Sequence, residues 1–324
     1  MHFYGTLGTA CNTTETLSAL FTAGMTGVRL NLSHVGLAEC EHLLKGIYWP
    51  AAKAAGVEAH LIIDLQGPEL RVGTMKETMA FPEGKTVILG QGGVPVPRTI
   101  LDYARVGHEI SLDDSALLIR VEEHNGTHLV CRVLRGGVLK SRKSLSILGV
   151  QPDTPTLTEE DLANLDLAEE MGVTHILQPF VRGKKDLEVL RAELDKRGLN
   201  HVQIMAKIEN RLGLDHLDEI IAHTDQLCIA RGDLGNSMPL WELPRVQKDI
   251  AARCVKAERE FCLVTQLLWS MENRAVPTRA EVLDIYNGVL DGCSSLMLTG
   301  ETAVGKYPVQ AMEYLVKTAN TALK

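Results

Sequence analysis

Residues 174–209 read THILQPFVRGKKDLEVLRAELDKRGLNHVQIMAKIE, in which two short β-type runs enclose a helical stretch. The runs 174–180 and 203–209 are short and largely apolar, whereas 185–198 repeats its apolar residues at helical spacing. A strand, a helix and a second strand in this order predict two parallel strands joined by a crossover helix. The fold of the whole chain therefore depends on how often this unit recurs.

The same alternation continues through most of the sequence. The β-type runs are 3–8, 28–33, 58–67, 174–180, 203–209, 226–232, 261–266 and 295–301. Helical stretches separate most of them, and a last one covers 309–324. Repeated β–α units favour a parallel sheet covered by helices, and eight of them favour a closed barrel. We therefore predict an α/β protein with a (β/α)8 TIM barrel.

Residues 74–152 interrupt this rhythm. The segment carries glycine and proline clusters, GQGGVPVP and RGG, and short alternating runs such as THLVCRVL at 127–134. Such punctuation is typical of antiparallel hairpins. We expect a small β-barrel-like lid domain at 74–152, inserted after the third barrel strand, with the barrel formed by 1–73 and 153–324. The residues outside the insertion come close to the roughly 250 of a bare barrel.

Composition and charge restrict the class of protein. The 33 Lys and Arg residues against 41 Asp and Glu give a net charge of −8, which argues against a general nucleic-acid binder. No apolar run approaches the roughly 18–20 residues of a membrane span, and the N-terminus lacks a secretory signal. The seven scattered cysteines, with no CxxC pair, predict reduced thiols. We expect a cytoplasmic protein that acts on small molecules.

Charged and polar residues recur at the ends of the predicted strands, where the side chains of a barrel converge on its active-site face. They are Arg29, Asn31, Ser33, Asp64, Lys207, Glu209, Arg231, Asp233, Thr265, Gln266, Thr299 and Glu301. We read several of them as alternating along their strands, so that they share one side. Glu209 and Asp233 suit Mg²⁺, and the cations Arg29 and Lys207 then suit an anion. This pattern favours metal-assisted phosphoryl transfer or enolate stabilisation.

Ten segments in order resemble the pyruvate kinase family over nearly the whole length. They include AGMTGVRLNLSH at 23–34, DLQGPELRVG at 64–73, ISLDDSALLIRVEE at 110–123, AKIENRLGL at 206–214, IARGDLG at 229–235 and LTGETAVGKYP at 298–308. The resemblance implies a catalytic TIM barrel with a mobile β lid inserted after strand three. It implies transfer of the phosphoryl group of phosphoenolpyruvate to ADP, giving pyruvate and ATP.

The resemblance also implies roles for single residues. Arg29 matches a phosphate contact, and Lys207 matches the lysine that stabilises the transferring phosphoryl group. Gly232 and Thr265 match substrate contacts, with Thr265 near the route of the proton that converts the enolate to pyruvate. Glu209 and Asp233 match the ligands of Mg²⁺ or Mn²⁺.

Further matches concern K⁺ and the nucleotide. The implied K⁺ ligands are the side chains of Asn31, Ser33 and Asp64 and the backbone carbonyl of Leu65, and Glu69 matches the acidic position of K⁺-dependent members. The implied nucleotide contacts are Asn31, His34, Arg71, Lys143 and one aspartate of the pair Asp113 and Asp114.

Some positions depart from the family pattern. Gln66 stands where the family has lysine, and residues 143–149 read KSLSILG in place of the usual lid loop. Two alternatives stay open beside the kinase: a metal-dependent pyruvate-enolate lyase or decarboxylase, and a catalytically weak sensor of phosphoenolpyruvate or nucleotide. The sequence stops after the last predicted barrel helix, so we expect any homo-oligomer to form without the contacts of the family's C-terminal domain.

Overall fold

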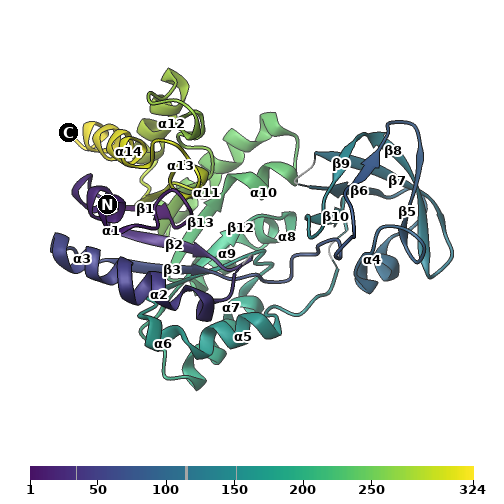
Figure 1. The fold of residues 1–324 in the computed structure, drawn as a ribbon, viewed down its shortest axis with the longest axis horizontal. Coiled ribbons are helices and arrows are strands. Elements are labelled where there is room, and N and C mark those ends of the chain that lie inside the picture. The colour runs from purple at the N-terminus through teal and green to yellow at the C-terminus, as the bar shows by residue number, and fades with distance from the viewer. Residues whose placement is uncertain (34, 114–115, 151) are drawn as a thin grey trace. The chain divides into compact units, whose positions relative to one another are not determined.

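The computed structural model describes residues 1–33, 35–113, 116–150 and 152–324. They divide into two units, which Figure 1 shows: a barrel unit, Met1–Gly67 with Thr156–Lys324, and an inserted unit, Pro68–Pro155. These bounds lie a few residues outside the predicted 74–152. The physical reason is backbone pairing, because Val72 N donates to Lys143 O and Leu145 N donates to Leu70 O. Residues 70–72 therefore belong with the inserted unit.

Eight parallel strands close the barrel, as predicted. They are β1 (His2–Thr6), β2 (Gly27–Asn31), β3 (His60–Asp64), β11 (His175–Gln178), β12 (Gln203–Ile208), β13 (Gln226–Ala230), β14 (Glu260–Val264) and β15 (Ser295–Met297). Their order around the barrel is β1-β15-β14-β13-β12-β11-β3-β2. Each lies within one of the eight runs expected from the sequence, apart from differences of a residue or so at the start of a strand. The TIM-barrel fold is confirmed.

Helices cover the barrel strands on the outside (Figure 1). They are α1 (Thr14–Thr22), α2 (Glu41–Leu43), α3 (Trp49–Ala55), α5 (Glu159–Asp166), α6 (Ala168–Met171), α7 (Lys184–Lys196), α8 (Arg211–Asp215), α9 (Leu217–His223), α10 (Arg231–Asn236), α11 (Leu243–Lys256), α12 (Arg279–Leu290), α13 (Gly300–Ala303) and α14 (Pro308–Ala322). Local sequence explains where several begin. The α5 and α12 helices open on capping boxes, Thr158 with Asp161 and Thr278 with Glu281.

Two apolar layers make up the core of the barrel unit. A small cluster fills the barrel interior with side chains from alternate strand positions, among them Tyr4, Ile62 and Met205. A larger cluster packs the outer faces of the strands against the helices, with fully buried leucines such as Leu17 and Leu190. This packing makes the strands a rigid frame, and it leaves their C-terminal ends to carry polar residues.

The inserted unit is antiparallel, as its hairpin pattern predicted. Five strands pair in the order β10-β6-β7-β8-β5, namely β5 (Thr86–Gly90), β6 (Glu109–Leu112), β7 (Leu117–His124), β8 (His128–Arg135) and β10 (Leu145–Ile147). A second sheet pairs β4 (Met79–Phe81) with β9 (Gly137–Leu139), and one helix, α4 (Arg98–Tyr103), completes the unit. It has an apolar core of its own, which includes Ile100, Ile119 and Leu129.

The helices and the cysteines bear on the class of protein. Among the residues it describes, no helix has both the length and the apolar character needed to cross a membrane. All seven cysteines are buried free thiols, as their scattered spacing predicted.

Candidate active site

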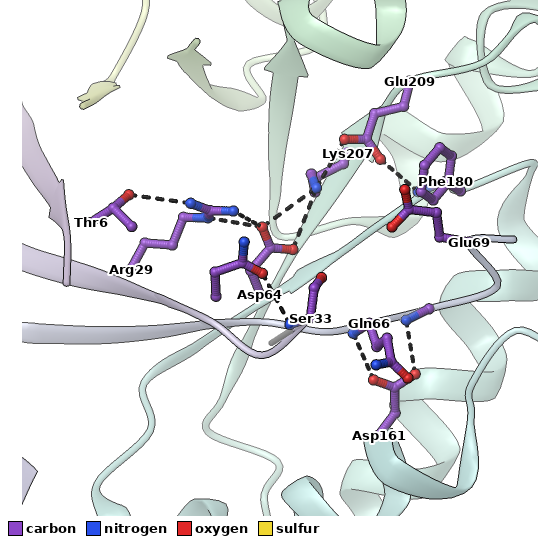
Figure 2. A network of polar contacts seen from close by, with 12 residues as sticks. Thr6, Arg29, Ser33, Asp64, Gln66, Glu69, Asp161, Phe180, Lys207 and Glu209 are labelled. Carbon is purple, nitrogen blue, oxygen red and sulfur yellow. Dashed lines mark hydrogen bonds and ion pairs between the residues drawn. The ribbon is translucent and has the colours of Figure 1, made fainter. Parts of the chain in front are cut away.

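The polar residues predicted at the strand ends meet at the C-terminal end of the barrel. Arg29 lies on β2, Asp64 ends β3, Lys207 lies on β12, and Glu209 follows β12 directly. Figure 2 shows these four side chains pointing toward one another from β2, β3 and the end of β12. Parallel strands bring residues from distant parts of the sequence to one edge, which is why the period of the strands predicted this cluster.

Asp64 is the centre of the cluster. Arg29 donates from Nε to Asp64 Oδ2 at 2.8 Å, and its Nη2 lies 2.6 Å from the same oxygen. Lys207 Nζ lies 3.4 Å from both Asp64 oxygens. The Asp64 side chain is only 3% exposed, so its charge is balanced by these two cations rather than by water.

The two carboxylate oxygens of Glu209 have different partners. Oε2 accepts a hydrogen bond of 2.9 Å from the backbone N–H of Phe180, whose φ of +52° is unusual for a residue other than glycine. Oε1 lies 2.9 Å from Lys207 Nζ as an ion pair. Among the described residues, Lys207 is the partner of this buried oxygen.

Burial and charge together set the pKa values of this pair. Burial raises the pKa of Glu209 to about 8, because the nearby Lys207 only partly offsets it and Asp233 adds to it. For Lys207, burial lowers the pKa, but the carboxylates of Asp64 and Glu209 outweigh that effect and hold it above its ordinary value. The lysine therefore carries its positive charge at neutral pH.

The segment after β13 corrects one prediction. The alternation read for Arg231 and Asp233 is wrong, because β13 ends at Ala230 and α10 begins at Arg231. Asp233 lies in the first turn of this helix, close enough to Lys207 and Glu209 to influence the pKa of each. The helix thus brings Asp233 to the cluster by a route that the strand pattern did not predict.

Gly232 and Thr265, both expected to contact substrate, lie side by side. A Cβ atom added to Gly232 would lie 3.2 Å from Thr265 Cγ2. Thr265 has a φ of +76°, and its carbonyl accepts a hydrogen bond of 2.6 Å from Arg231 Nη2. Arg231 also pairs with Asp284 at 2.6 Å, so it fixes this turn.

The residues expected to bind K⁺ lie on two neighbouring strands. Asn31 on β2 and Asp64 on β3 are register partners. Asn31 Oδ1 accepts a hydrogen bond of 3.1 Å from Ser33 N, which brings Ser33 back toward the strand end. Leu65 follows Asp64 and is buried, with its N–H donated to Leu177 O. All of the expected donor atoms in this set are oxygens.

The strand-end interpretation is also wrong for Thr299 and Glu301. β15 ends at Met297, and Glu301 lies in α13. Glu301 is 1% exposed, and its two oxygens accept backbone N–H groups from Leu268 and Thr299 at 3.0 and 2.7 Å. These bonds tie the end of the barrel to its neighbouring loop.

Three expected nucleotide contacts gather within the inserted unit. Lys143 Nζ lies 2.7 Å from Asp113 Oδ1, and Asp113 N donates to Ser144 O at 3.0 Å. Arg71 pairs with Glu69 and donates to Arg142 O at 2.9 Å. Of the other three expected residues, Asn31 ends β2, whereas His34 and Asp114 lie outside the described residues.

Sequence reasoning missed three residues of this site. Thr6 accepts from Arg29 Nη1 at 3.3 Å, and the end of β1 could have indicated it. Phe180 contributes a backbone amide, for which its side chain gives no signal. Asp161 accepts from the amides of Gln66 and Gly67, and its capping box at 158–161 was the available sign.

The acidic side chains of the cluster offer oxygen donors to a divalent cation. Within the described ranges, no group of three or more His, Cys, Asp and Glu side chains could hold a metal ion by itself. Glu209 Oε1 is nevertheless a buried carboxylate oxygen whose partner among those residues is Lys207, and Asp233 is near. Mg²⁺ commonly takes one or two carboxylates and completes its shell with substrate oxygens and water. The residues fit such a site.

Comparison with known proteins gives the family. A family model described as "Pyruvate kinase, barrel domain" matches residues 2–312. The pyruvate kinase of Aeropyrum pernix is 36% identical over 98% of this chain and 70% of its own length. Those of Geobacillus stearothermophilus and Chlamydia pneumoniae are 35% and 36% identical, and the matches span 55% and 66% of their lengths. The chain thus spans about half to two thirds of most of these relatives. By this match and by its barrel, the chain belongs to the pyruvate kinase family.

Proposed function

We propose that the chain catalyses transfer of the phosphoryl group of phosphoenolpyruvate to ADP, giving pyruvate and ATP. The observation that carries the proposal is the buried cluster of two cations and two carboxylates, Arg29, Lys207, Asp64 and Glu209. Phosphoenolpyruvate carries phosphate and carboxylate charges that Arg and Lys neutralise. Membership of the pyruvate kinase family supports the same reaction.

Positioning and charge neutralisation dominate phosphoryl transfer. In this proposal Arg29 and Lys207 bind the phosphoryl oxygens, and Asp64 orients both cations before substrate arrives. Lys207 remains protonated, so its ammonium group can also stabilise the enolate as the phosphoryl group leaves. Gly232 and Thr265 contact the substrate, and Thr265 lies on the proposed route of the proton that completes pyruvate.

The proposed cofactors are a divalent and a monovalent cation. Glu209 and Asp233 would hold Mg²⁺ or Mn²⁺, which supplies positive charge to the oxygens of the phosphoryl group when bound. Asn31, Ser33, Asp64 and the carbonyl of Leu65 would hold K⁺ through oxygen donors.

For the nucleotide we propose the contacts that the family resemblance implies, namely Asn31, His34, Arg71, Lys143 and one aspartate of the pair Asp113 and Asp114. Of that pair, the Asp113 carboxylate lies 2.7 Å from Lys143 Nζ, and Asp114 lies outside the described residues. Lys143 and Arg71 are suited to nucleotide phosphates by charge.

The proposal extends to the setting of the enzyme. We place it in the cytoplasm, in line with its seven buried free thiols. We expect small-molecule substrates, no nucleic-acid or membrane partner, and a homo-oligomer if copies of the chain associate.

The test is formation of pyruvate from phosphoenolpyruvate and ADP by purified protein, with Mg²⁺ present and with K⁺ or Na⁺ as the monovalent ion. We expect ADP-dependent turnover that is faster in K⁺, and a loss on the order of 100-fold or more in Lys207→Met. Pyruvate formed in the absence of phosphoenolpyruvate and ADP, from oxaloacetate with release of CO2 or from a 4-hydroxy-2-oxo acid with release of an aldehyde, would indicate the decarboxylase or lyase alternative. Binding of phosphoenolpyruvate without any turnover would indicate the sensor.

A further inference from the structure

The turn that follows β3 is tightly constrained. Leu65 is buried, and Gly67 has a φ of +60°. A Cβ atom on Gly67 would lie 2.4 Å from Pro179 Cγ, so only glycine fits there. This short segment connects Asp64 to the point where the chain leaves the barrel unit, after Gly67.

The carboxylate of Asp161, in the first turn of α5, holds this turn from the side (Figure 2). Asp161 Oδ1 accepts from Gln66 N at 2.8 Å, and Oδ2 accepts from Gly67 N at 3.0 Å. Oδ2 also accepts from Thr158 N at 2.9 Å, which is the usual bond of a capping box. The Asp161 residue is fully buried.

A capping box alone does not account for this arrangement. Its bond to Thr158 needs one oxygen, whereas here both oxygens are used and two of the three bonds reach a segment 94 and 95 residues earlier in the chain. Three N–H donors together satisfy a buried carboxylate. An asparagine would turn one oxygen into an NH₂ group facing an N–H donor, so the site requires a carboxylate.

The bonds reach the active site through two peptide units. Gln66 is two residues after Asp64, the side chain that orients both Arg29 and Lys207. The carbonyl between them belongs to Leu65, a proposed ligand of K⁺. Any shift of the Gln66 and Gly67 amides therefore moves the Asp64 backbone and this carbonyl together.

We propose that Asp161 is a positioning residue for phosphoryl transfer, which fixes the end of β3 so that Asp64 and the Leu65 carbonyl stay aligned for phosphoenolpyruvate and K⁺. The inference rests on the proposed function. Asp161 acts through the backbone of other residues and does not itself contact substrate.

The test compares Asp161→Asn with a matched buried carboxylate, Asp186→Asn. Asp186 lies in the first turn of α7 and is 6% exposed; it accepts from Thr156 Oγ1 and Arg182. We expect Asp161→Asn to raise the KM for phosphoenolpyruvate and the K⁺ concentration for half-activation by about 10-fold, with a smaller change in kcat at saturation. Asp186→Asn should lower the unfolding temperature while leaving both constants within about two-fold of wild type.

A second variant keeps the test valid if Asp161→Asn does not fold. Thr158→Ala removes the other side of the capping box but leaves Asp161 in place, so it should lower stability without changing the K⁺ requirement. The inference is overturned if Asp161→Asn folds and leaves both constants unchanged. It is also overturned if Thr158→Ala, which keeps the Asp161 carboxylate, raises the K⁺ concentration for half-activation by about the 10-fold expected of Asp161→Asn.

A binding readout separates this inference from the proposed reaction. Phosphoenolpyruvate and K⁺ should each raise the unfolding temperature of the wild type, and less so that of Asp161→Asn, with tetramethylammonium as the control cation. Wild type that shows these shifts but no turnover contradicts the proposed reaction alone. Equal shifts in wild type and Asp161→Asn contradict the role of Asp161 alone.

Discussion

At the scale of single residues, Glu209 shows how a buried carboxylate can be prepared for a cation. The Phe180 amide donates to one oxygen, and Lys207 Nζ lies 2.9 Å from the other. Burial raises the pKa of Glu209 to about 8, because the positive charge of Lys207 only partly offsets burial and the nearby carboxylates of Asp233 and Asp64. A divalent cation would relieve the cost of this buried charge, which is why we assign Glu209 to the metal.

We expect Glu209→Gln to weaken binding of Mn²⁺ and to lower kcat/KM on the order of 100-fold, because an amide supplies no negative charge to the metal. Direct Mn²⁺ titration of the folded protein is the main measurement, and it does not depend on turnover. Glu260→Gln is the matched control, since Glu260 is exposed at the opposite end of the barrel, at the start of β14. Unchanged Mn²⁺ affinity in Glu209→Gln would refute the metal assignment.

At the scale of elements, the segments just after the strands carry unusual backbone conformations. Phe180 follows β11 with a φ of +52°, and Thr265 and Gln266 follow β14 with φ values of +76° and +55°. Residues other than glycine adopt this region at a cost, and such conformations gather at functional sites. Here they aim the Phe180 amide at Glu209 and place Thr265 beside Gly232. The packed strands and the Arg231 guanidinium stabilise turns that would otherwise relax.

The α10 helix allows a test that separates catalysis from folding. Gly232→Ala should not destabilise the helix, because alanine is favoured over glycine by about 1 kcal/mol. Its Cβ would however lie 3.2 Å from Thr265 Cγ2 and crowd the proposed substrate site. We expect KM for phosphoenolpyruvate to rise on the order of 10-fold or more while the unfolding temperature stays equal or rises.

Gly235→Ala in the same helix is the control for that experiment. Its added Cβ would meet Leu243 Cδ2 at 3.4 Å, an ordinary contact away from Thr265. It should show the same effect on stability and no change in KM. If both alanines raise KM equally, the crowding of Thr265 is not the cause.

At the scale of the whole molecule, the sequence predicted what depends on periodic pattern. The eight strands followed from alternating β and α segments, and the meeting of Arg29, Asp64, Lys207 and Glu209 followed from barrel geometry. The inserted unit extends a few residues beyond the expected 74–152. Backbone pairing between residues 70–72 and 143–145 accounts for its start, and this pairing produces no periodic pattern of apolar residues in the sequence. The roles of Asp161 and the Phe180 amide depend on contacts with distant backbone, which side-chain identity does not encode.

The opposite, N-terminal end of the barrel holds a cluster of three histidines at the starts of β1, β3 and β11. The ring centres of His2 and His60 are 4.7 Å apart, and those of His60 and His175 are 4.6 Å apart. Burial, followed by the neighbouring imidazoles, lowers the pKa of His175 to about 3, and burial also lowers the pKa values of His2 and His60. Glu260 and Glu58 oppose the shifts of His2 and His60 only in part.

These pKa values make the stability of the barrel depend on pH. A histidine whose pKa is lowered by folding binds a proton more tightly in the unfolded state. The contribution of His175 to the free energy of unfolding is therefore complete above the unfolded pKa of 6.5 and is lost as the pH falls toward about 3. Within that window, protonation of His175 in the unfolded state should lower the free energy of unfolding by up to about 1.4 kcal/mol for each unit that the pH falls. We expect His175→Gln, which cannot titrate, to flatten the fall of unfolding free energy between pH 6.5 and about 4, as measured by urea denaturation at each pH. His42→Gln, at an exposed site, should leave the slope as in wild type. An unchanged slope in His175→Gln would show that groups other than His175 govern the acid sensitivity of the barrel.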